Sequence, residues 1–409
     1  MTPSLKIQRL KVLFSGICGL MLMLGIARFA YTPMMPLMQQ QAGLGLSAGG
    51  WLASINYLGY LSGVLLAASI SNLVVKFRLY RIGIVLAVIS TAAMALADNI
   101  YLWASMRYLA GFSSAAGVMF GSGLTLHWLI KNNLRSELGI HFSGAGLGIA
   151  LGAAAIELSP QLSWAQQWWL LSGLALVLAI PAWHYIPRPD AKPTVNDTDT
   201  KYSEVDQVAV SSPDTVLRHL PKAGFVRLFM AFYGCAGVGY VISATFIVAI
   251  VVDQSSAVDP ISAQSQGNFA FLLLGLAAAP ACIFWDLVAR RLGDINTLIV
   301  VSVLHMFGII LPALVTNIWA AYVSTLLFGA TFIGLVSLVL TMAGRYYPDK
   351  PAKMMGKMTL WYSVAQIMAP AITGVIAEHG GQYSDGLLLG FGAMSLGLIF
   401  LLLMKRSSY

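Results

Sequence analysis

Charged residues are scarce in this chain. Asp, Glu, Lys and Arg make up only 10% of its 409 residues, whereas 58% are hydrophobic and the mean hydropathy is +0.77. A soluble globule of this length needs far more polar surface than these residues supply. The composition therefore excludes a soluble protein and indicates an all-α membrane protein with many spanning helices.

The sequence also lacks the motifs of metal, redox and nucleotide chemistry. Its three cysteines, Cys18, Cys235 and Cys282, lie in separate apolar stretches without paired ligand spacing, so we expect no disulfide framework, no metal and no cofactor. No phosphate-binding motif is present, which argues against ATP as the energy source. A catalytic constellation at one membrane face, such as paired His and Asp, is missing too, so we expect no enzyme activity.

Basic residues outnumber acidic ones by 24 to 16, and the pI is near 9.3. In a soluble protein this excess would suggest a nucleic-acid partner, but here Lys and Arg occupy short segments between apolar runs and form no extended basic face. We therefore attribute the excess to membrane topology, with the lipid bilayer and not nucleic acid as the partner.

Twelve apolar windows are long enough to cross a bilayer, which takes roughly 20 helical residues at about 1.5 Å rise each. We place them at residues 11–38, 48–72, 79–97, 100–128, 137–158, 165–186, 223–251, 265–286, 295–314, 317–343, 355–378 and 384–404.

The basic residues can be placed on one side of these windows. With the N-terminus cytoplasmic, the outside loops hold no Lys or Arg. Then 24 − 2 = 22 basic residues lie inside or at the inner boundary of a window, among them Lys76, Arg78 and Arg81. Only Arg28 and Arg107 remain inside apolar windows, away from that boundary. This alternation predicts a multi-pass protein of twelve helices with both termini cytoplasmic.

A polar stretch of mixed charge, residues 188–222, separates two apolar halves and is typical of a flexible linker. We expect an N-terminal six-helix bundle at residues 1–187 and a C-terminal one at residues 223–409. Gly25-Ile-Ala-Arg28 in the first window matches Gly237-Val-Gly-Tyr240 in the seventh. Such repetition is typical of transporters whose two bundles rock around a central site.

Two motifs resemble those of the major facilitator superfamily. Arg107-Tyr-Leu-Ala-Gly111, followed by small residues as far as Gly117, is similar to its fourth-helix motif, and Trp285-Asp286-Leu-Val-Ala-Arg290-Arg291-Leu-Gly293-Asp294 is similar to the second copy of its cytoplasmic loop motif. The first copy of the loop motif, around residues 69–81, lacks the expected Gly and Asp. The resemblance covers essentially the whole chain and implies two pseudo-symmetric six-helix bundles, the major facilitator fold.

A longer block narrows the resemblance. Gly25-Ile-Ala-Arg28-Phe-Ala-Tyr31-Thr-Pro33-Met-Met-Pro36, followed by Leu52-Ala-Ser-Ile-Asn56-Tyr57-Leu-Gly59-Tyr60, resembles the bacterial YbfB/YjiJ-type branch. The resemblance implies a transporter of a bacterial inner membrane that works by alternating access, but it does not identify the substrate.

The two arginines inside apolar windows are the strongest candidates for a site. Arg28 lies 17 residues beyond Lys11, roughly 25 Å along a helix, and Arg107 lies roughly 13 Å from the outer end of its window. No Asp or Glu lies at a comparable depth, and an unpaired buried charge is costly. Because guanidinium forks suit carboxylates and phosphates, we interpret the missing counter-charge as the substrate. Alternatively, each arginine binds backbone carbonyls or a carboxylate and only ties helices together.

Polar or amphipathic residues on helices expected around the same cavity are further candidates for substrate contact, although each can instead form an interhelical hydrogen bond or a packing contact. These residues are Tyr31, Asn56, Tyr57, Tyr240, Ser243, Trp361 and Gln366.

Proton coupling requires a titratable group near the transport pathway. The candidates are Glu157 and Glu378 toward the outside and His141 toward the inside, whereas His305 is expected to face lipid or the core. A structural role is the alternative for each.

Together these features predict a secondary active transporter, acting as a monomer, for a small anionic organic solute such as a carboxylate or a polycarboxylate siderophore, by proton-coupled uptake (symport). The alternative is proton-driven efflux of amphipathic metabolites or drugs, for which a cavity lined by aromatics and methionines would suffice. The glycine-rich run from Gly144 to Gly152 is partly similar to the fifth-helix motif of antiporters but lacks its proline, which argues against efflux.

Overall fold

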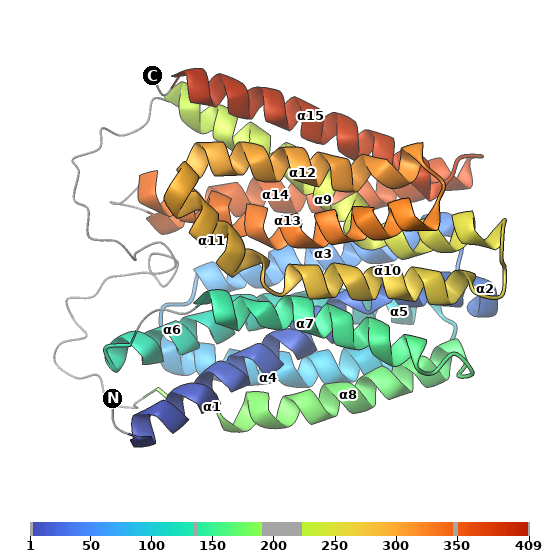
Figure 1. Ribbon diagram of the computed structural model, residues 1–409. Helices are drawn as coiled ribbons and strands as arrows, with labels where there is room; N and C mark the ends of the chain where they lie inside the picture. The colour runs from blue at the N-terminus through green and yellow to red at the C-terminus, as the bar shows by residue number, and fades with distance from the viewer. Residues whose placement is uncertain (1–2, 135–137, 190–222, 347–350, 408–409) are drawn as a thin grey trace.

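A computed structural model describes residues 3–134, 138–189, 223–346 and 351–407 (Figure 1). Within these ranges every regular element is a helix, and the helices lie side by side along one axis. Most of the predicted linker, residues 190–222, is outside the described residues. The helical architecture predicted from composition is therefore confirmed.

The first half of the chain supplies six helical rods, two of which contain a stretch of π-helix. They are α1 (Pro3–Leu20) with η1 (Met21–Phe29) and α2 (Tyr31–Ala42), then α3 (Leu46–Ala68), α4 (Leu73–Ala93), α5 (Ile100–Ala116) with η2 (Gly117–Gly121) and α6 (Ser122–Lys131), then α7 (Leu138–Glu157) and α8 (Trp164–His184). The second half supplies α9 (Ala223–Ser256), α10 (Ala263–Ala278), α11 (Ala281–Leu292), α12 (Asp294–Leu314), α13 (Ile318–Tyr346), α14 (Pro351–Glu378) and α15 (Tyr383–Ser407).

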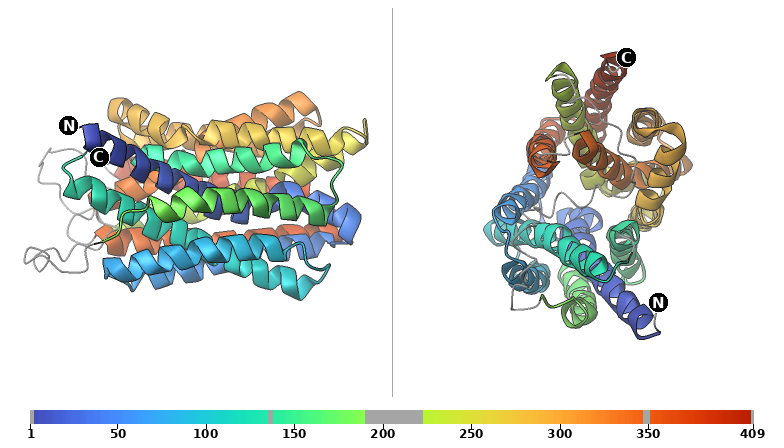
Figure 2. Two further views of the ribbon diagram at one scale, coloured as in Figure 1. Left: turned by 90° about the horizontal axis from the view of Figure 1, so that it is seen from below. Right: turned by 90° about the vertical axis from the view of Figure 1, so that its left-hand side faces the viewer.

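In the described chain, ten continuous helices are long and apolar enough to cross a membrane, and α10 with α11 forms an eleventh span if the bent pair is counted as one. The remaining rod is α4, whose first half carries three basic residues. The start of α1 and the end of α15 lie at the same end of the bundle (Figures 1 and 2). We call this the terminal end and the opposite one the far end. Twelve crossings and the orientation of the termini stay predictions.

The structure corrects the predicted position of the third helix. We expected windows at 48–72 and 79–97 with a basic loop between them, but α3 ends at Ala68 and α4 already begins at Leu73. The cause is local: the Asn72 side chain accepts hydrogen bonds from the N–H groups of Val74 and Val75 and caps α4. Lys76, Arg78 and Arg81 therefore lie on a helix and not in a loop.

The eighth window, expected as one helix over residues 265–286, is two helices. α10 and α11 meet at a 46° bend at Ala279 and Pro280. A proline inside a helix removes one backbone hydrogen bond and clashes with the preceding turn, so the bend forms at this position.

The two halves of the chain pack as separate groups of helices. In the end-on view the first half, blue to green, lies on one side and the second, yellow to red, on the other (Figure 2). Helices α3 and α14, and helices α7 and α10, form the main contacts between the groups. At the second crossing, a Cβ placed on Gly146 would lie 2.3 Å from the Ala279 nitrogen, so only glycine permits this approach.

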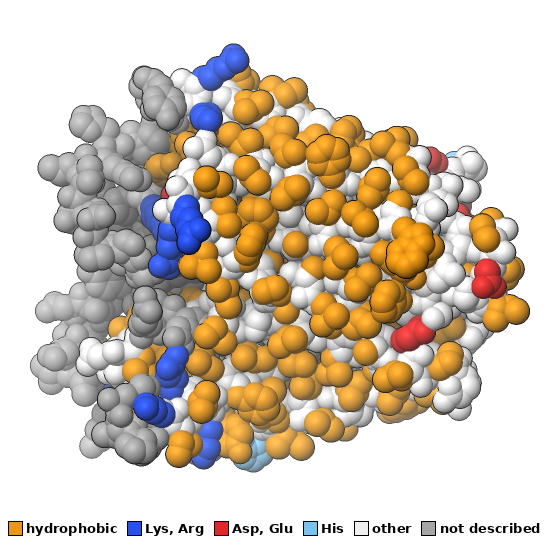
Figure 3. All heavy atoms as spheres, in the orientation of Figure 1, with side chains coloured by type: hydrophobic (Ala, Val, Ile, Leu, Met, Phe, Trp, Pro, Cys, Tyr) orange, Lys and Arg blue, Asp and Glu red, His pale blue; other side chains and the backbone are white. Residues whose placement is uncertain are grey.

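The surface divides into a hydrophobic belt and two polar ends of opposite sign (Figure 3). Lys and Arg gather at the terminal end, including those in the last turns of α11 and α15, while Asp and Glu lie mainly at the far end. In the connection after α9, a hydrogen bond from the Ser262 hydroxyl holds the pKa of Asp259 below its usual range, which keeps this carboxyl charged. This charge pattern is typical of a multi-pass membrane protein.

Candidate functional site

The first spanning rod is irregular at mid-length. Nine residues of π-helix, η1, lead into a turn at Ala30, beyond which α2 continues. Pro33 adds to the irregularity because it has no N–H to donate to the carbonyl one turn earlier. π-Helical turns are rare in proteins overall, and those that occur often lie at functional sites. Arg28, only 5% exposed, lies at the end of this segment.

Arg28 is enclosed by aromatic rings. Its guanidinium carbon lies 4.4 Å from the ring centre of Tyr60, 4.6 Å from that of Tyr57 and 5.3 Å from that of Phe29. The Tyr57 and Tyr60 hydroxyls also interact electrostatically with the guanidinium, while its Nε has no hydrogen-bond partner. No carboxylate within the described ranges forms a salt bridge with it. Ring faces and hydroxyl dipoles therefore stabilise this charge in place of an anion.

Arg107 lies beside Arg28 but makes different contacts. Its Nη1 and Nη2 donate to the main-chain carbonyls of Ala27 at 3.2 Å and Arg28 at 3.1 Å, and its guanidinium lies 4.4 Å from the ring centre of Tyr31. The two positive charges are close enough to repel each other. The structure thus brings the two arginines together and holds Arg107 in the helix-tying arrangement considered as the alternative. Its contact with a substrate stays a prediction.

Asn56 and Tyr31 connect neighbouring helices around the arginines. The Asn56 Nδ2 donates to the main-chain carbonyl of Arg107 at 2.7 Å, and the Tyr31 hydroxyl donates to the carbonyl of Gly49 at 3.0 Å. Asn56 Oδ1 is buried without a partner. These contacts fix α3 against α5 and α2, leaving one amide acceptor of Asn56 free.

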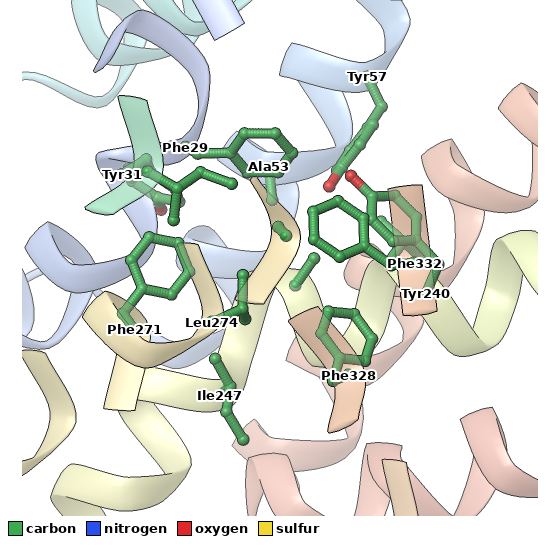
Figure 4. Packing of buried hydrophobic residues seen from close by; sticks show 14 of the residues in the cluster. Phe29, Tyr31, Ala53, Tyr57, Tyr240, Ile247, Phe271, Leu274, Phe328 and Phe332 are labelled. Atoms are coloured by element: carbon green, nitrogen blue, oxygen red, sulfur yellow. The ribbon is translucent and has the colours of Figure 1, made fainter. Parts of the chain in front are cut away.

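Tyr240 brings the second half of the chain to the same place. Its hydroxyl is hydrogen-bonded to that of Tyr57, and Figure 4 shows the two hydroxyls pointing toward one another from α9 and α3. Ser243 on α9 and Gln366 on α14 are also buried, and the Ser243 Oγ and Gln366 Oε1 have no hydrogen-bond partner. Trp361, in contrast, is 53% exposed and lies away from the cluster.

Several aromatic residues of the cluster were not singled out from the sequence. Tyr60 and Phe29 contact Arg28 directly, and Phe332 and Tyr362 stack on Tyr240 with ring centres 5.4 and 5.8 Å apart. Tyr60 lies one turn after Asn56 on α3, which was the one available signal. The other contacts depend on how the helices are rotated against each other.

Glu157 bridges the two halves at the far end. It lies at the end of α7 and accepts hydrogen bonds from two residues of α10: the Ser265 hydroxyl and, at 3.1 Å, the Asn268 Nδ2. Gln264 continues this network, since its Nε2 donates to Asn268 Oδ1 at 3.0 Å and to the Pro33 carbonyl at 3.3 Å. This hydrogen-bond network thus joins α7, α10 and α2.

The other coupling candidates lie elsewhere. His141 is fully buried within the first half, where its Nε2 lies 2.9 Å from the Ser122 hydroxyl, and Glu378 is exposed at the end of α14. His305 is buried in the second half, 2.8 Å from the Thr331 hydroxyl. Within the described chain, Glu157 alone among these four residues forms side-chain hydrogen bonds across the two halves.

Further contacts between the halves close the far end. The Thr32 hydroxyl donates to the Ala244 carbonyl at 2.8 Å, Gln39 donates to the Tyr383 hydroxyl at 2.7 Å, and that hydroxyl donates to the Leu46 carbonyl at 2.8 Å. A recess of about 240 Å³ lies outside them, bordered by α2, α9 and α15. The arginine cluster is therefore separated from the far end by a layer of hydrogen-bonded residues.

The fold matches that of solved transporters. The crystal structure of the nucleoside transporter NupG aligns with a TM-score of 0.70 and 11% identity over 98% of this chain and 99% of that one. A mutant form of NupG aligns with a TM-score of 0.75 and 13% identity over 97% and 99%. At this identity the likeness shows a shared fold.

Sequence relatives carry transporter names. Efflux pump radE of Floropilus chiversii is 28% identical over 135 residues, 33% of this chain and 25% of that protein, so the chain spans about a quarter of that relative. Uncharacterized MFS-type transporter YceJ of Bacillus subtilis (strain 168) is 24% identical over 288 residues, 69% of this chain and 67% of that protein. A family model described as uncharacterised MFS-type transporter YbfB matches residues 20–402, and the chain therefore belongs to this family of major facilitator transporters.

Proposed function

We propose that the protein is a secondary active transporter of a small organic anion, which binds at Arg28 between the two halves and enters the cell together with protons. Small carboxylates and polycarboxylate siderophores are solutes of this class. The proposal includes twelve crossings by a monomer in a bacterial inner membrane, with both termini cytoplasmic. Alternating exposure of the site then follows from movement of the bundle at residues 1–187 against that at residues 223–409.

One observation carries the proposal. Arg28 is buried at mid-length of its rod, keeps an unpaired Nε and contacts rings and hydroxyls where a carboxylate would be expected. An arginine at the centre of a spanning helix costs about 2.5–3.5 kcal/mol on insertion, and such residues mark substrate pathways. The Tyr57 and Tyr60 hydroxyls are neutral ligands that an anion can displace from the guanidinium with a gain in charge pairing.

The topology rests on two observations. Basic side chains gather at the end where α1 begins and α15 ends, which the positive-inside rule places in the cytoplasm. Because the first and last helices share that end, the number of crossings is even, and α4 supplies the crossing that completes twelve.

Glu157 is the residue that we propose as the proton-coupling group. A charged Glu157 accepts hydrogen bonds from Ser265 and Asn268 and holds α7 to α10, so protonation weakens the contact between the halves at the far end. Proton binding would thereby be linked to opening of the far end.

Transport in proteoliposomes tests the proposal. With an inward proton gradient, a radiolabelled carboxylate should accumulate in vesicles containing the protein. Arg28→Gln should abolish accumulation, and Arg28→Lys should retain part of it because the charge remains without the planar guanidinium. Arg406→Gln, at an exposed arginine in the last turn of α15, is the control and should act as wild type. If Arg28→Gln binds and transports every tested anion as wild type does, the anion site is wrong.

Efflux of amphipathic metabolites is the second candidate. It is favoured by the aromatic cluster around Arg28 and by the similarity of one third of the chain to a protein named an efflux pump. The same assay separates the two: an imported solute accumulates on the side to which protons flow, whereas antiport expels it from that side.

A further inference from the structure

Three aromatic residues of the first half surround the Arg28 guanidinium. Tyr57 and Tyr60 lie on α3 and Phe29 on η1, with ring centres between 4.4 and 5.3 Å from the guanidinium carbon. A guanidinium stacked on rings leaves its edge, where the N–H groups point, free for a planar acceptor. The first half thus contributes the Arg28 guanidinium with aromatic rings packed around it.

The second half faces this cation with a row of nearly parallel rings. Tyr240 of α9 stacks on Phe332 of α13 at 5.4 Å and 19°, and on Tyr362 of α14 at 5.8 Å and 23°. Tyr362 in turn stacks on Tyr233 at 4.4 Å and 19°. Figure 4 shows Tyr240 and Phe332 beside one another, with the Tyr57 side chain reaching toward Tyr240.

Two contacts join the row of rings to the first half. The Tyr57 and Tyr240 hydroxyls are hydrogen-bonded, and Phe29 meets Phe332 edge to face at 6.5 Å. Both contacts cross between the halves, so both must break when the halves move apart. Parting uncovers the parts of Tyr240 and Phe332 that Tyr57 and Phe29 now contact, next to the Arg28 guanidinium.

We propose that the transported anion is an aromatic carboxylate, whose carboxylate binds Arg28 while its ring stacks between Phe29, Tyr240 and Phe332. The inference rests on the proposed function, because it takes the anion site at Arg28 as given. An aliphatic anion would use the guanidinium but none of the ring faces. Each aromatic contact of this geometry strengthens binding by roughly 2- to 10-fold beyond the burial of apolar area.

Four matched probes test the inference on the purified full-length protein by equilibrium binding. Benzoate carries both the carboxylate and the aromatic ring, whereas cyclohexanecarboxylate keeps the carboxylate and the size but has no π face. Benzamide keeps the aromatic ring without the charge, and acetate keeps only the carboxylate. We expect benzoate to bind at least about tenfold more tightly than each of the other three.

The outcomes distinguish failure of the aromatic inference from failure of the anion site at Arg28. If cyclohexanecarboxylate binds as tightly as benzoate, the aromatic inference is overturned while the anion site stands. If benzamide binds as tightly as benzoate, or if no carboxylate binds, the anion site itself is overturned.

Substitutions of Tyr240 and Phe332 test whether these two rings cause the preference for an aromatic ligand. Tyr240→Leu should reduce the ratio of benzoate to cyclohexanecarboxylate affinity to about one, whereas Tyr240→Phe keeps the ring and should keep the ratio. Phe332→Leu, on α13, is a second variant with the same expectation as Tyr240→Leu, in case one of them does not fold. An unchanged ratio in a folded leucine variant would show that these rings do not contact the ligand.

Discussion

Arg107 donates a hydrogen bond of 3.1 Å to the main-chain carbonyl of Arg28, so one buried arginine holds the backbone of the other. A second bond, 3.2 Å long, reaches the carbonyl of Ala27. Both arginines lie inside apolar windows of the sequence, but their surroundings differ. The Arg107 guanidinium binds backbone carbonyls, whereas the Arg28 guanidinium contacts aromatic rings and hydroxyls that a ligand can replace.

This difference predicts opposite phenotypes for the same substitution. Arg107→Gln should lower the unfolding free energy by roughly 1–3 kcal/mol, because buried carbonyls of η1 lose their donors. Arg28→Gln should leave the stability without ligand nearly unchanged but remove the stabilisation that an anion adds. Thermal unfolding in detergent, with and without benzoate, measures both. The assignment fails if Arg107→Gln is as stable as wild type and loses only the response to the anion.

Glu157→Gln should uncouple transport from the proton gradient. A glutamine cannot release a proton, so concentrative uptake should fall to the level of equilibration, while exchange of labelled for unlabelled solute continues. Asp98→Asn, an exposed acidic residue at the same end, is the matched control and should behave as wild type. Gradient-driven accumulation that survives in Glu157→Gln would place the coupling group elsewhere.

Much of the fold was predictable because each spanning helix needs its own apolar window. The family and the all-helical architecture followed from that pattern and from the motifs, and both are confirmed. The bend at Pro280 and the early start of α4 were missed, since the first depends on a single proline and the second on a single Asn72 cap. Short-range signals of this kind do not change the hydropathy profile.

The candidate site was predictable only in part. Arg28 and Arg107 stood out because no acidic residue shares their depth, and the structure does place them side by side. The carbonyls that bind Arg107 belong to η1, a π-helical segment that no sequence pattern indicated. Contacts of Arg28 with Tyr60, and of Tyr240 with Phe332, depend on the rotation of each helix within the bundle.

The α7–α10 crossing makes a prediction about stability. A Cβ on Gly146 would lie 2.3 Å from the Ala279 nitrogen and 2.6 Å from the Gly275 carbonyl oxygen, both backbone atoms that cannot move aside. Gly146→Ala should therefore destabilise the protein by roughly 1–3 kcal/mol. Gly173→Ala in α8 meets no atom within 4 Å and should be neutral or stabilising by up to about 1 kcal/mol, since alanine favours the helix. Equal melting temperatures for the two variants would argue against close packing at this crossing.

Tyr383 makes a prediction about access to the site from the far end. Its hydroxyl accepts from Gln39 and donates to the Leu46 carbonyl, so Tyr383→Phe removes two hydrogen bonds between the halves and keeps the ring stacked on Phe246 at 4.4 Å. Interhelical hydrogen bonds in membranes contribute about 0.6 kcal/mol each on average, so we expect the population open at the far end to rise by roughly 3- to 10-fold.

The reporter is Ser243→Cys, a change of one atom at a buried position of α9, in a background in which Cys18, Cys235 and Cys282 are replaced by serine. Labelling of this cysteine by a membrane-impermeant maleimide added at the far end should accelerate by the same factor in Tyr383→Phe. Tyr101→Phe, an exposed tyrosine of α5, controls for the loss of a hydroxyl as such. An unchanged labelling rate in Tyr383→Phe would mean that these two hydrogen bonds do not hold the far end closed.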